Sequence, residues 1–313
     1  MSILVELPER LYPRDAFAQF APVAPYNLGT ARAMAWMSQL AYETRHPDKI
    51  ELICSRWELK RPRIITNDTN GEPELLQVHT RGIVVTGHGA TIIAFAGTDP
   101  LVPANWVSDF DVGLNVGARL KLTPGPLHRG FGKAFDAVSA QVTEALAERG
   151  ADPLLITGHS MGAALAVIAA DRCLSEQKVR ATAVYAFGMP RVGDEDFARR
   201  YNDTLGAITY RLVHGDDIVA TVPPSRLGFR HVGRLIRCAR GSRFPAELPS
   251  TEFSDEPQFV GSLVGGLQQG VRDLLALQPQ PAFRDDALGQ MSRFLLPHIG
   301  DHLPDRYWHA CEA

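Results

Sequence analysis

The sequence predicts an α/β fold in which a mostly parallel central sheet carries helices on both faces. Short apolar runs typical of buried strands alternate with helical patterns from residue 90 onward. One of these runs passes through Gly158, Ser160 and Gly162 into an alanine-rich segment, which is the pattern of a strand, a sharp turn and a helix. Polar residues directly follow several of the runs, and the functional groups of a parallel sheet gather at the carboxyl ends of its strands.

The composition is that of an ordinary globular protein. Its 313 residues are 45% hydrophobic and 21% charged, which is sufficient for one large domain. We expect a single α/β domain over residues 1–313 with a cap-like insertion at about 240–296. The net charge of −3 offers no basic surface, so nucleic acid is not an expected partner.

The N-terminal residues and the spacing of the cysteines indicate where in the cell we expect the protein to be found. The first ten residues lack the basic start and long apolar core of a signal peptide. We therefore expect a cytoplasmic protein, or a secreted one if a leader has been removed. The four cysteines are widely spaced and match neither a disulfide framework nor a metal-binding motif. We expect no metal, no cofactor and no transmembrane segment.

The residue pattern of the N-terminal third predicts one helix followed by β-strands. From residue 27, apolar residues recur at helical spacing, with Asn27 or Thr30 as the N-cap and an end before Pro47. Four runs rich in β-forming residues follow, and turn residues at 87–89 join the last two into a hairpin. These runs cover residues 50–59, 75–80, 82–86 and 90–96.

Strands and helices then alternate along the chain. The strand at 90–96 ends in Gly97-Thr98, where a backbone N–H group is well placed to donate to an oxyanion. A helical pattern runs from about residue 128 to Gly150 and leads into the strand before Ser160. Beyond the alanine-rich helix we expect a strand at 181–187, a polar helix at 194–202 and a strand at 207–213.

Ser160 is the candidate nucleophile. The glycines two positions before and after it permit a turn too tight for Cβ atoms, and this turn lifts the serine hydroxyl clear of the sheet. The helix beginning at Met161 directs its free N–H groups and the positive end of its dipole to the same place. Negative charge that develops on a bound carbonyl oxygen would be stabilised there.

A serine nucleophile needs a histidine as its base and a carboxylate that orients the histidine. When the serine lies on such a turn, the acid and then the histidine follow it in the chain. Asp216 and Asp217 come directly after the strand at 207–213, and the residue pattern does not distinguish them. One of four later histidines should be the base: His231, His298, His302 or His309.

In this order, the motifs resemble the class 3 lipases, the family of the filamentous-fungal triacylglycerol lipases and their bacterial relatives. The resemblance covers about residues 27–302 and implies an α/β-hydrolase fold. It rests on Phe95-Ala-Gly-Thr98, Asn105-Trp-Val-Ser-Asp109, His128-Arg-Gly-Phe131, Thr157-Gly-His-Ser-Met-Gly-Ala-Ala-Leu165, Phe187-Gly-Met-Pro-Arg-Val-Gly193, Asp217-Ile-Val219, and Asp301-His302 followed by Tyr307.

The resemblance implies a role for each residue of the site. Ser160 would be the nucleophile, Asp217 the orienting acid and His302 the base. Thr98 and the backbone N–H of Met161 would form the oxyanion hole.

Other parts of the family pattern concern the surroundings of the site. By resemblance, the segment at 101–107 would be the family's lid, and Trp106 packed on the edge of the sheet is the equal alternative. Phe229-Arg-His231 resembles a structural strand of the family, which argues against His231 as the base. His298 is then the second choice after His302.

Together these features predict a serine ester hydrolase, a lipase that cleaves fatty-acyl esters of glycerol-type lipids through an acyl-enzyme. A phospholipase or short-chain carboxylesterase is the alternative within enzymes, and a catalytically silent lipase-like binding scaffold is the alternative outside them. The expected partners are a lipid or ester substrate and, transiently, a lipid interface.

A long segment separates the candidate acid from the candidate base. Residues 259–275 place apolar side chains on one helical face and glycine, glutamine and charge on the other. We expect this segment to cap an acyl groove beside the lid at 101–107, and an amphipathic helix packed on the core is the alternative.

Overall fold

The computed structural model describes residues 5–23, 25–67, 80–97, 127–249, 283–286, 295 and 297–312. Thr98, the lid segment at 101–107, the segment at 259–275 and most of the insertion expected at 240–296 lie outside these residues.

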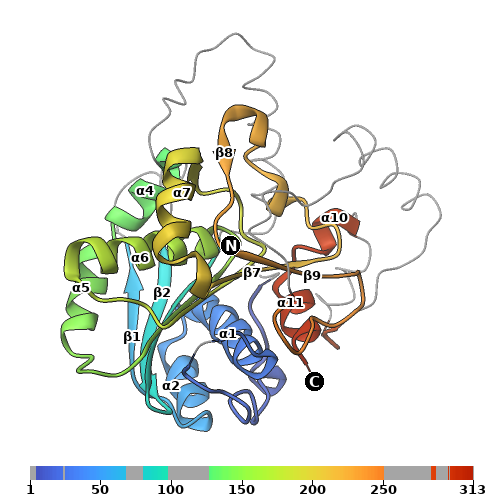
Figure 1. The fold of residues 1–313 in the computed structure, drawn as a ribbon. Coiled ribbons are helices and arrows are strands. Elements are labelled where there is room, and N and C mark those ends of the chain that lie inside the picture. Colours follow the sequence, from blue (N-terminus) through green and yellow to red (C-terminus); the bar gives the residue numbers. More distant parts are fainter. Residues whose placement is uncertain are drawn as a thin grey trace.

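A seven-stranded sheet forms the centre of the protein (Figure 1). Its first two strand pairs are antiparallel, and every pair from β3 to the far edge at β9 is parallel, which confirms the mostly parallel sheet. The strands lie in the order β1 (Lys60–Thr66), β2 (Arg81–Gly87), β3 (Ala90–Phe95), β4 (Leu154–His159), β5 (Ala183–Phe187), β7 (Thr209–His214) and β9 (Arg234–Cys238). A separate ribbon pairs β6 (Gly193–Asp194) with β8 (Phe229–Arg230).

Helices cover both faces of this sheet, as expected. In Figure 1, α1 (Leu28–Leu40) and α2 (Pro47–Arg56) lie on one side, and α4 (Arg129–Asp136), α5 (Ser139–Ala147) and α6 (Met161–Gln177) on the other. The strands supply alternate residues to the two resulting cores. Leu155 of β4 belongs to the core under α1, whereas its neighbours Leu154 and Ile156 belong to the core under α6.

The remaining described elements are short. The helices are α7 (Glu195–Thr204), α10 (Pro297–Gly300) and α11 (Pro304–Ala310). The 3-10 turns are η1 (Glu9–Leu11), η2 (Ala41–Glu43), η4 (Gly206–Ile208), η5 (Val219–Thr221) and η6 (Ser225–Leu227). Among the described helices, none is long and apolar enough to cross a membrane.

Local sequence signals account for several element boundaries. Asn27 caps α1 by accepting a hydrogen bond from the Thr30 N–H at 2.7 Å, which confirms one of the two predicted caps. The predicted hairpin joins β2 to β3 and turns at His88 and Gly89, whose φ angles are +51° and +70°.

Two predicted elements differ in the structure. The run at 50–59 was expected to be a strand, but most of it belongs to helix α2. Pro47 occupies the first turn, and Ile50, Ile53 and Cys54 turn one apolar face to the core at helical spacing. The single helix expected at 128–150 is two helices, because Val138 adopts φ −123° and ψ 0° and breaks the helical path between α4 and α5.

The C-terminal segment returns to the central sheet. Helix α11 packs against α1, where the Trp308 and Trp36 rings stack with centroids 4.4 Å apart. Phe244, which follows β9, donates its backbone N–H to the Ala310 carbonyl at 2.8 Å. The residues between α10 and α11, His302 among them, are thereby held near the carboxyl ends of the parallel strands.

Candidate active site

Ser160 lies in the predicted sharp turn between β4 and α6. Its backbone has φ 59° and ψ −128°, a strained conformation for a residue with a side chain. A Cβ on Gly158 would lie 2.2 Å from the Gly162 carbonyl oxygen, and one on Gly162 would lie 2.3 Å from that of Phe95. The two glycines are therefore required by close backbone packing, for the steric reason inferred from the sequence.

The end of β3 lies directly beside this turn. A Cβ on Gly97 would lie 2.7 Å from the Ser160 Cβ and 2.8 Å from the His159 carbonyl oxygen. Met161 begins helix α6, whose first turn has N–H groups without partners in the helix. The positive end of this helix therefore lies at Ser160. Thr98 follows Gly97 but lies outside the described residues.

Asp217 and His302 are joined by a hydrogen bond in the interior. The Asp217 Oδ2 to His302 Nδ1 distance is 2.8 Å, and the two residues are 2% and 3% exposed. A carboxylate only accepts hydrogen bonds, so Nδ1 carries the proton and, in a neutral ring, Nε2 has the free lone pair. Among the described residues, this buried Nε2 has no hydrogen-bond partner. The ring is thus oriented to accept a proton at Nε2.

Further donors hold the Asp217 carboxylate. Val219 donates its backbone N–H to Oδ1 at 2.8 Å, and the Tyr307 hydroxyl donates to Oδ2. Burial, together with the neighbouring Asp217, raises the pKa of Tyr307 well above its ordinary value, so the phenol keeps its proton. The carboxylate therefore has fixed donors on both oxygens.

Gly188 connects the pair to the turn that carries Ser160. The Ser160 N–H donates to the Phe187 carbonyl at 2.9 Å, and the next residue, Gly188, has a φ of +58°. A Cβ there would lie 2.8 Å from Asp217 Oδ2 and 3.0 Å from His302 Cε1. Ser160, Asp217 and His302 therefore surround the same end of β5.

Asp216 has different surroundings from Asp217. It is exposed, and its carboxylate faces Arg240 at 3.4 Å. The residue pattern had left these two acids undistinguished, and the geometry favours Asp217 as the partner of a histidine.

Arg240 also holds Asp301, the residue before His302. Its guanidinium donates to the buried Asp301 carboxylate through Nε at 3.0 Å and Nη2 at 2.8 Å. Burial alone would raise the pKa of Asp301, but the nearby His214 ring and the hydrogen bonds from Arg240 outweigh burial and lower it. This ion pair anchors the turn that presents His302.

The other candidate histidines have other environments. His231 is buried, and its Nε2 donates to the Ala220 carbonyl at 2.8 Å; burial and nearby arginines lower its pKa well below the ordinary value. His309 stacks on Phe283 with ring centroids 3.9 Å apart. His298 lies in α10, where its carbonyl accepts from the Ile218 N–H at 3.3 Å.

His159 makes a contact that sequence reasoning missed. Its Nε2 donates to the His302 carbonyl at 2.8 Å, and its Nδ1 accepts from the Tyr42 hydroxyl at 2.7 Å. Burial and the adjacent His302 lower the pKa of His159 well below the ordinary value, so the ring is neutral. Nothing in the sequence indicates the partners of His159, which lie 117 and 143 positions away.

Comparison with known proteins shows what this chain is similar to. Residues 92–227 match the family model described as lipase (class 3). The matched residues make up less than half of the chain, and over them the chain is similar to the class 3 lipases. A secreted mono- and diacylglycerol lipase MDL3 of Malassezia globosa is 28% identical over 236 residues, which are 72% of this chain and 74% of that protein.

Other relatives match over shorter segments. The secreted mono- and diacylglycerol lipase 1 of Fusarium solani is 36% identical over 132 residues, 41% of this chain and 38% of that protein. A phospholipase A1-II 3 of Oryza sativa subsp. japonica is 32% identical over 179 residues, 47% of this chain and 41% of that protein. These two matches therefore cover less than half the length of either relative.

Solved structures support the α/β-hydrolase fold of the class 3 lipases. Lipase II from Rhizopus niveus superimposes with a TM-score of 0.50 at 21% identity over 75% of this chain and 90% of its own. A triacylglycerol lipase, described as having a catalytic centre formed by a serine protease triad, has a TM-score of 0.50 at 25% identity. That match covers 67% of this chain and 79% of the other.

Proposed function

We propose that this protein is a class 3 lipase, a serine ester hydrolase that cleaves fatty-acyl esters of glycerol-type lipids. The observation that carries the proposal is the buried Asp217–His302 hydrogen bond beside the turn that presents Ser160. The mono- and diacylglycerol lipases among its relatives support the substrate class. The arrangement argues against a silent binding scaffold, because binding alone does not require an oriented acid and base behind a serine.

In the proposed reaction, Ser160 Oγ attacks the ester carbonyl carbon while His302 Nε2 takes the hydroxyl proton. Asp217 holds the imidazole and stabilises its charged form. The Met161 N–H, together with Thr98 after Gly97, would donate to the oxyanion. The proton then passes from His302 to the departing alcohol, and an acyl-enzyme remains. Water, deprotonated by the same ring, releases the fatty acid and restores Ser160.

An organophosphate probe tests this proposal. Incubation of the full chain should add one phosphoryl group at Ser160, detectable by mass spectrometry of the peptides, and should abolish turnover of a soluble ester. Ser160→Ala should prevent both labelling and turnover, whereas exposed Ser242 can be replaced by alanine as a control without effect. Labelling at another residue, or full turnover by a folded Ser160→Ala variant, would contradict the proposal.

A phospholipase is the second candidate, because the rice relative carries the name phospholipase A1. Turnover should be measured on mono-, di- and triacylglycerols, phosphatidylcholine vesicles and short-chain esters, below and above the solubility limit of each. We expect acylglycerols to give the highest kcat/KM, with greater activity once an interface is present. Preference for phosphatidylcholine would favour the phospholipase, and preference for dissolved short esters the carboxylesterase.

We further propose that the insertion at about 240–296 caps the acyl groove beside the segment at 101–107. Its position in the sequence between Asp217 and His302 supports this role. Replacing Leu267 and Val271 together by aspartate should raise KM for long-chain esters and spare short ones. An equal effect on both substrates, with a lower Tm, would assign the segment to the core instead.

The location proposed for the enzyme also follows from its relatives. Both fungal relatives carry the word secreted in their names, which favours export over the cytoplasmic location expected from the sequence. Esterase activity that depends on Ser160 should then appear in the medium of the producing cells. Activity confined to washed, lysed cells would restore the cytoplasmic expectation.

A further inference from the structure

Glu43 is a buried carboxylate far along the chain from the catalytic candidates. It ends η2, directly after α1, and it is 0% exposed. Its Oε1 accepts from the Leu7 N–H at 2.9 Å and the Tyr12 hydroxyl at 2.8 Å, and the Lys49 ammonium lies 2.8 Å away. Its Oε2 is equally buried but has no hydrogen-bond partner among the described residues. An unpaired carboxylate oxygen in the interior is costly and calls for a partner.

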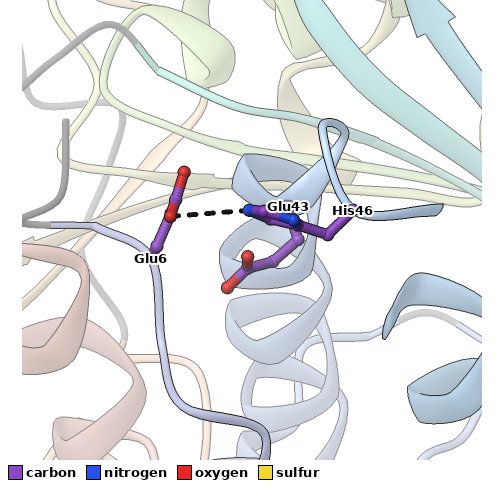
Figure 2. Close-up of side chains that lie close together, drawn as sticks. All are labelled: Glu6, Glu43 and His46. Atoms are coloured by element: carbon purple, nitrogen blue, oxygen red, sulfur yellow. Dashed lines mark ion pairs between the residues drawn. The ribbon is translucent and has the colours of Figure 1, made fainter. Parts of the chain in front are cut away.

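Two further metal-ligand side chains lie next to Glu43. One carboxylate oxygen each of Glu6 and Glu43 and one ring nitrogen of His46 lie within 4.8 Å of one another. Figure 2 shows the Glu6 carboxylate on the N-terminal segment facing the His46 ring, with Glu43 between the segments that carry them. The His46 Nε2 to Glu6 Oε2 distance is 3.6 Å. The side chains of His46 and Glu6 are 50% and 36% exposed, so a dissolved ion can reach the cluster.

We propose that Glu6, Glu43 and His46 bind a divalent transition-metal ion of the zinc class. Imidazole is a preferred ligand of zinc, and a His with two carboxylates is a ligand set zinc accepts, with a fourth position left to water. In a tetrahedral zinc site, neighbouring ligand atoms lie about 3.3 Å from one another. The Glu6 and His46 side chains are exposed enough to move toward the fixed Glu43 carboxylate until their ligand atoms reach this distance.

The local charge suits a cation. Lys49 neutralises part of the charge at Oε1, and Arg284, whose guanidinium donates to the Glu6 carbonyl, is itself paired with Asp286. The carboxylates of Glu6, Glu43 and Asp286 carry three negative charges, and Lys49 and Arg284 carry two positive charges. The cluster therefore keeps one net negative charge. The ion would supply the partner that Oε2 lacks and would cross-link the N-terminal segment to the turn after α1.

The proposed site is structural and independent of the proposed hydrolase activity. The sequence analysis predicts no metal because the four cysteines are widely spaced. Glu6 lies 37 positions before Glu43, and no ligand motif connects them. Only folding brings the N-terminal segment beside His46. The metal would therefore stabilise the folded chain, which gives a readout other than ester turnover.

Zinc titration of the full, EDTA-treated and dialysed chain tests the site. Calorimetry should give one zinc ion per chain, and zinc should raise Tm. Glu6→Gln and His46→Gln should each weaken zinc binding at least tenfold and remove most of the rise in Tm. Neither variant disturbs the buried hydrogen bonds of Glu43, so both should fold.

Two matched controls separate this site from general surface binding. Exposed Glu51 on α2 and half-buried His309 on α11 receive the same substitutions, Glu51→Gln and His309→Gln, and should retain wild-type zinc affinity. Equal affinity in all five proteins, or no zinc bound by the wild type, would overturn the site. Calcium or magnesium bound more tightly than zinc, with the same dependence on Glu6 and His46, would overturn the zinc class.

Discussion

At the scale of single residues, the two adjacent acids Asp216 and Asp217 differ only through their surroundings. Asp217 is buried and hydrogen-bonded to His302, whereas Asp216 is exposed and faces Arg240. The proposed mechanism assigns the orientation of the base to one carboxylate alone. The effects of removing the two charges should therefore differ widely.

We expect Asp217→Asn to reduce kcat by about four orders of magnitude, by analogy with the serine proteases, because an amide does not hold the productive imidazole tautomer. Asp216→Asn should reduce kcat less than about tenfold. Steady-state kinetics on a soluble ester would measure both effects. A reversed order would show that the acid has been assigned wrongly.

Tyr307 should contribute to both activity and stability. Removing its hydroxyl in Tyr307→Phe deletes one of the donors that hold the Asp217 carboxylate, which should cost about 1–3 kcal/mol in the free energy of unfolding. We also expect lower kcat, since the acid becomes less constrained. Urea unfolding and ester kinetics would measure the two effects.

Tyr201→Phe is the matched control. Tyr201 is also fully buried and bonds the Thr209 hydroxyl at 2.9 Å, away from the site. This variant should lose stability and keep its kcat. Equal kinetic losses in the two variants would mean that Tyr307 acts only through packing.

At the scale of elements, the β4–α6 turn depends on the absence of two side chains. Gly162→Ala would place a methyl group 2.3 Å from the Phe95 carbonyl oxygen, so the helix would have to move away from β3. We expect a loss of about 2–4 kcal/mol in the free energy of unfolding, with activity falling as Ser160 shifts.

Gly132→Ala on α4 is the control for this prediction. A Cβ there meets nothing within 4 Å, and alanine favours a helix by about 0.5–1 kcal/mol over glycine. Thermal or urea unfolding should therefore show changes of opposite sign for the two variants. A neutral Gly162→Ala would contradict the close-packing explanation of the turn.

These elements also show what could be predicted from sequence. The β4–α6 turn was predictable because its glycines, serine and helix are neighbours in the chain. The run at 50–59 was misassigned because a short apolar run fits a strand or a buried helix, and the packing of Ile50 and Ile53 decides between them. The Asp217–His302 pairing joins residues 85 positions apart, so the residues alone left the acid open and only the family resemblance selected Asp217.

At the scale of the whole molecule, buried neutral histidines link stability to pH. Burial lowers the pKa of His128 to about 4, and burial lowers those of His159 and His231 well below the ordinary value. The unfolded chain protonates these rings near pH 6.5, whereas the folded protein does not. Their contribution to stability is therefore complete above about pH 6.5 and is lost as the pH falls toward about 4.

Each such histidine should add a slope of up to about 1.4 kcal/mol per pH unit in that window. We expect His128→Phe to flatten the dependence of the unfolding free energy on pH by up to this amount. Urea unfolding at intervals between pH 4 and 7 would measure it. Parallel curves for the variant and the wild type would show that His128 does not contribute.

The order of the proposed catalytic residues along the chain has a consequence for biosynthesis. Ser160 and Asp217 follow strands β4 and β7, which emerge from the ribosome well before the C-terminal segment that carries His302. The Trp308–Trp36 stack and the hydrogen bond between Phe244 and Ala310 are among the contacts that hold this segment in place. A nascent chain that has already folded its sheet would still lack the proposed base, so we expect ester hydrolysis to begin only after translation has reached the last helix.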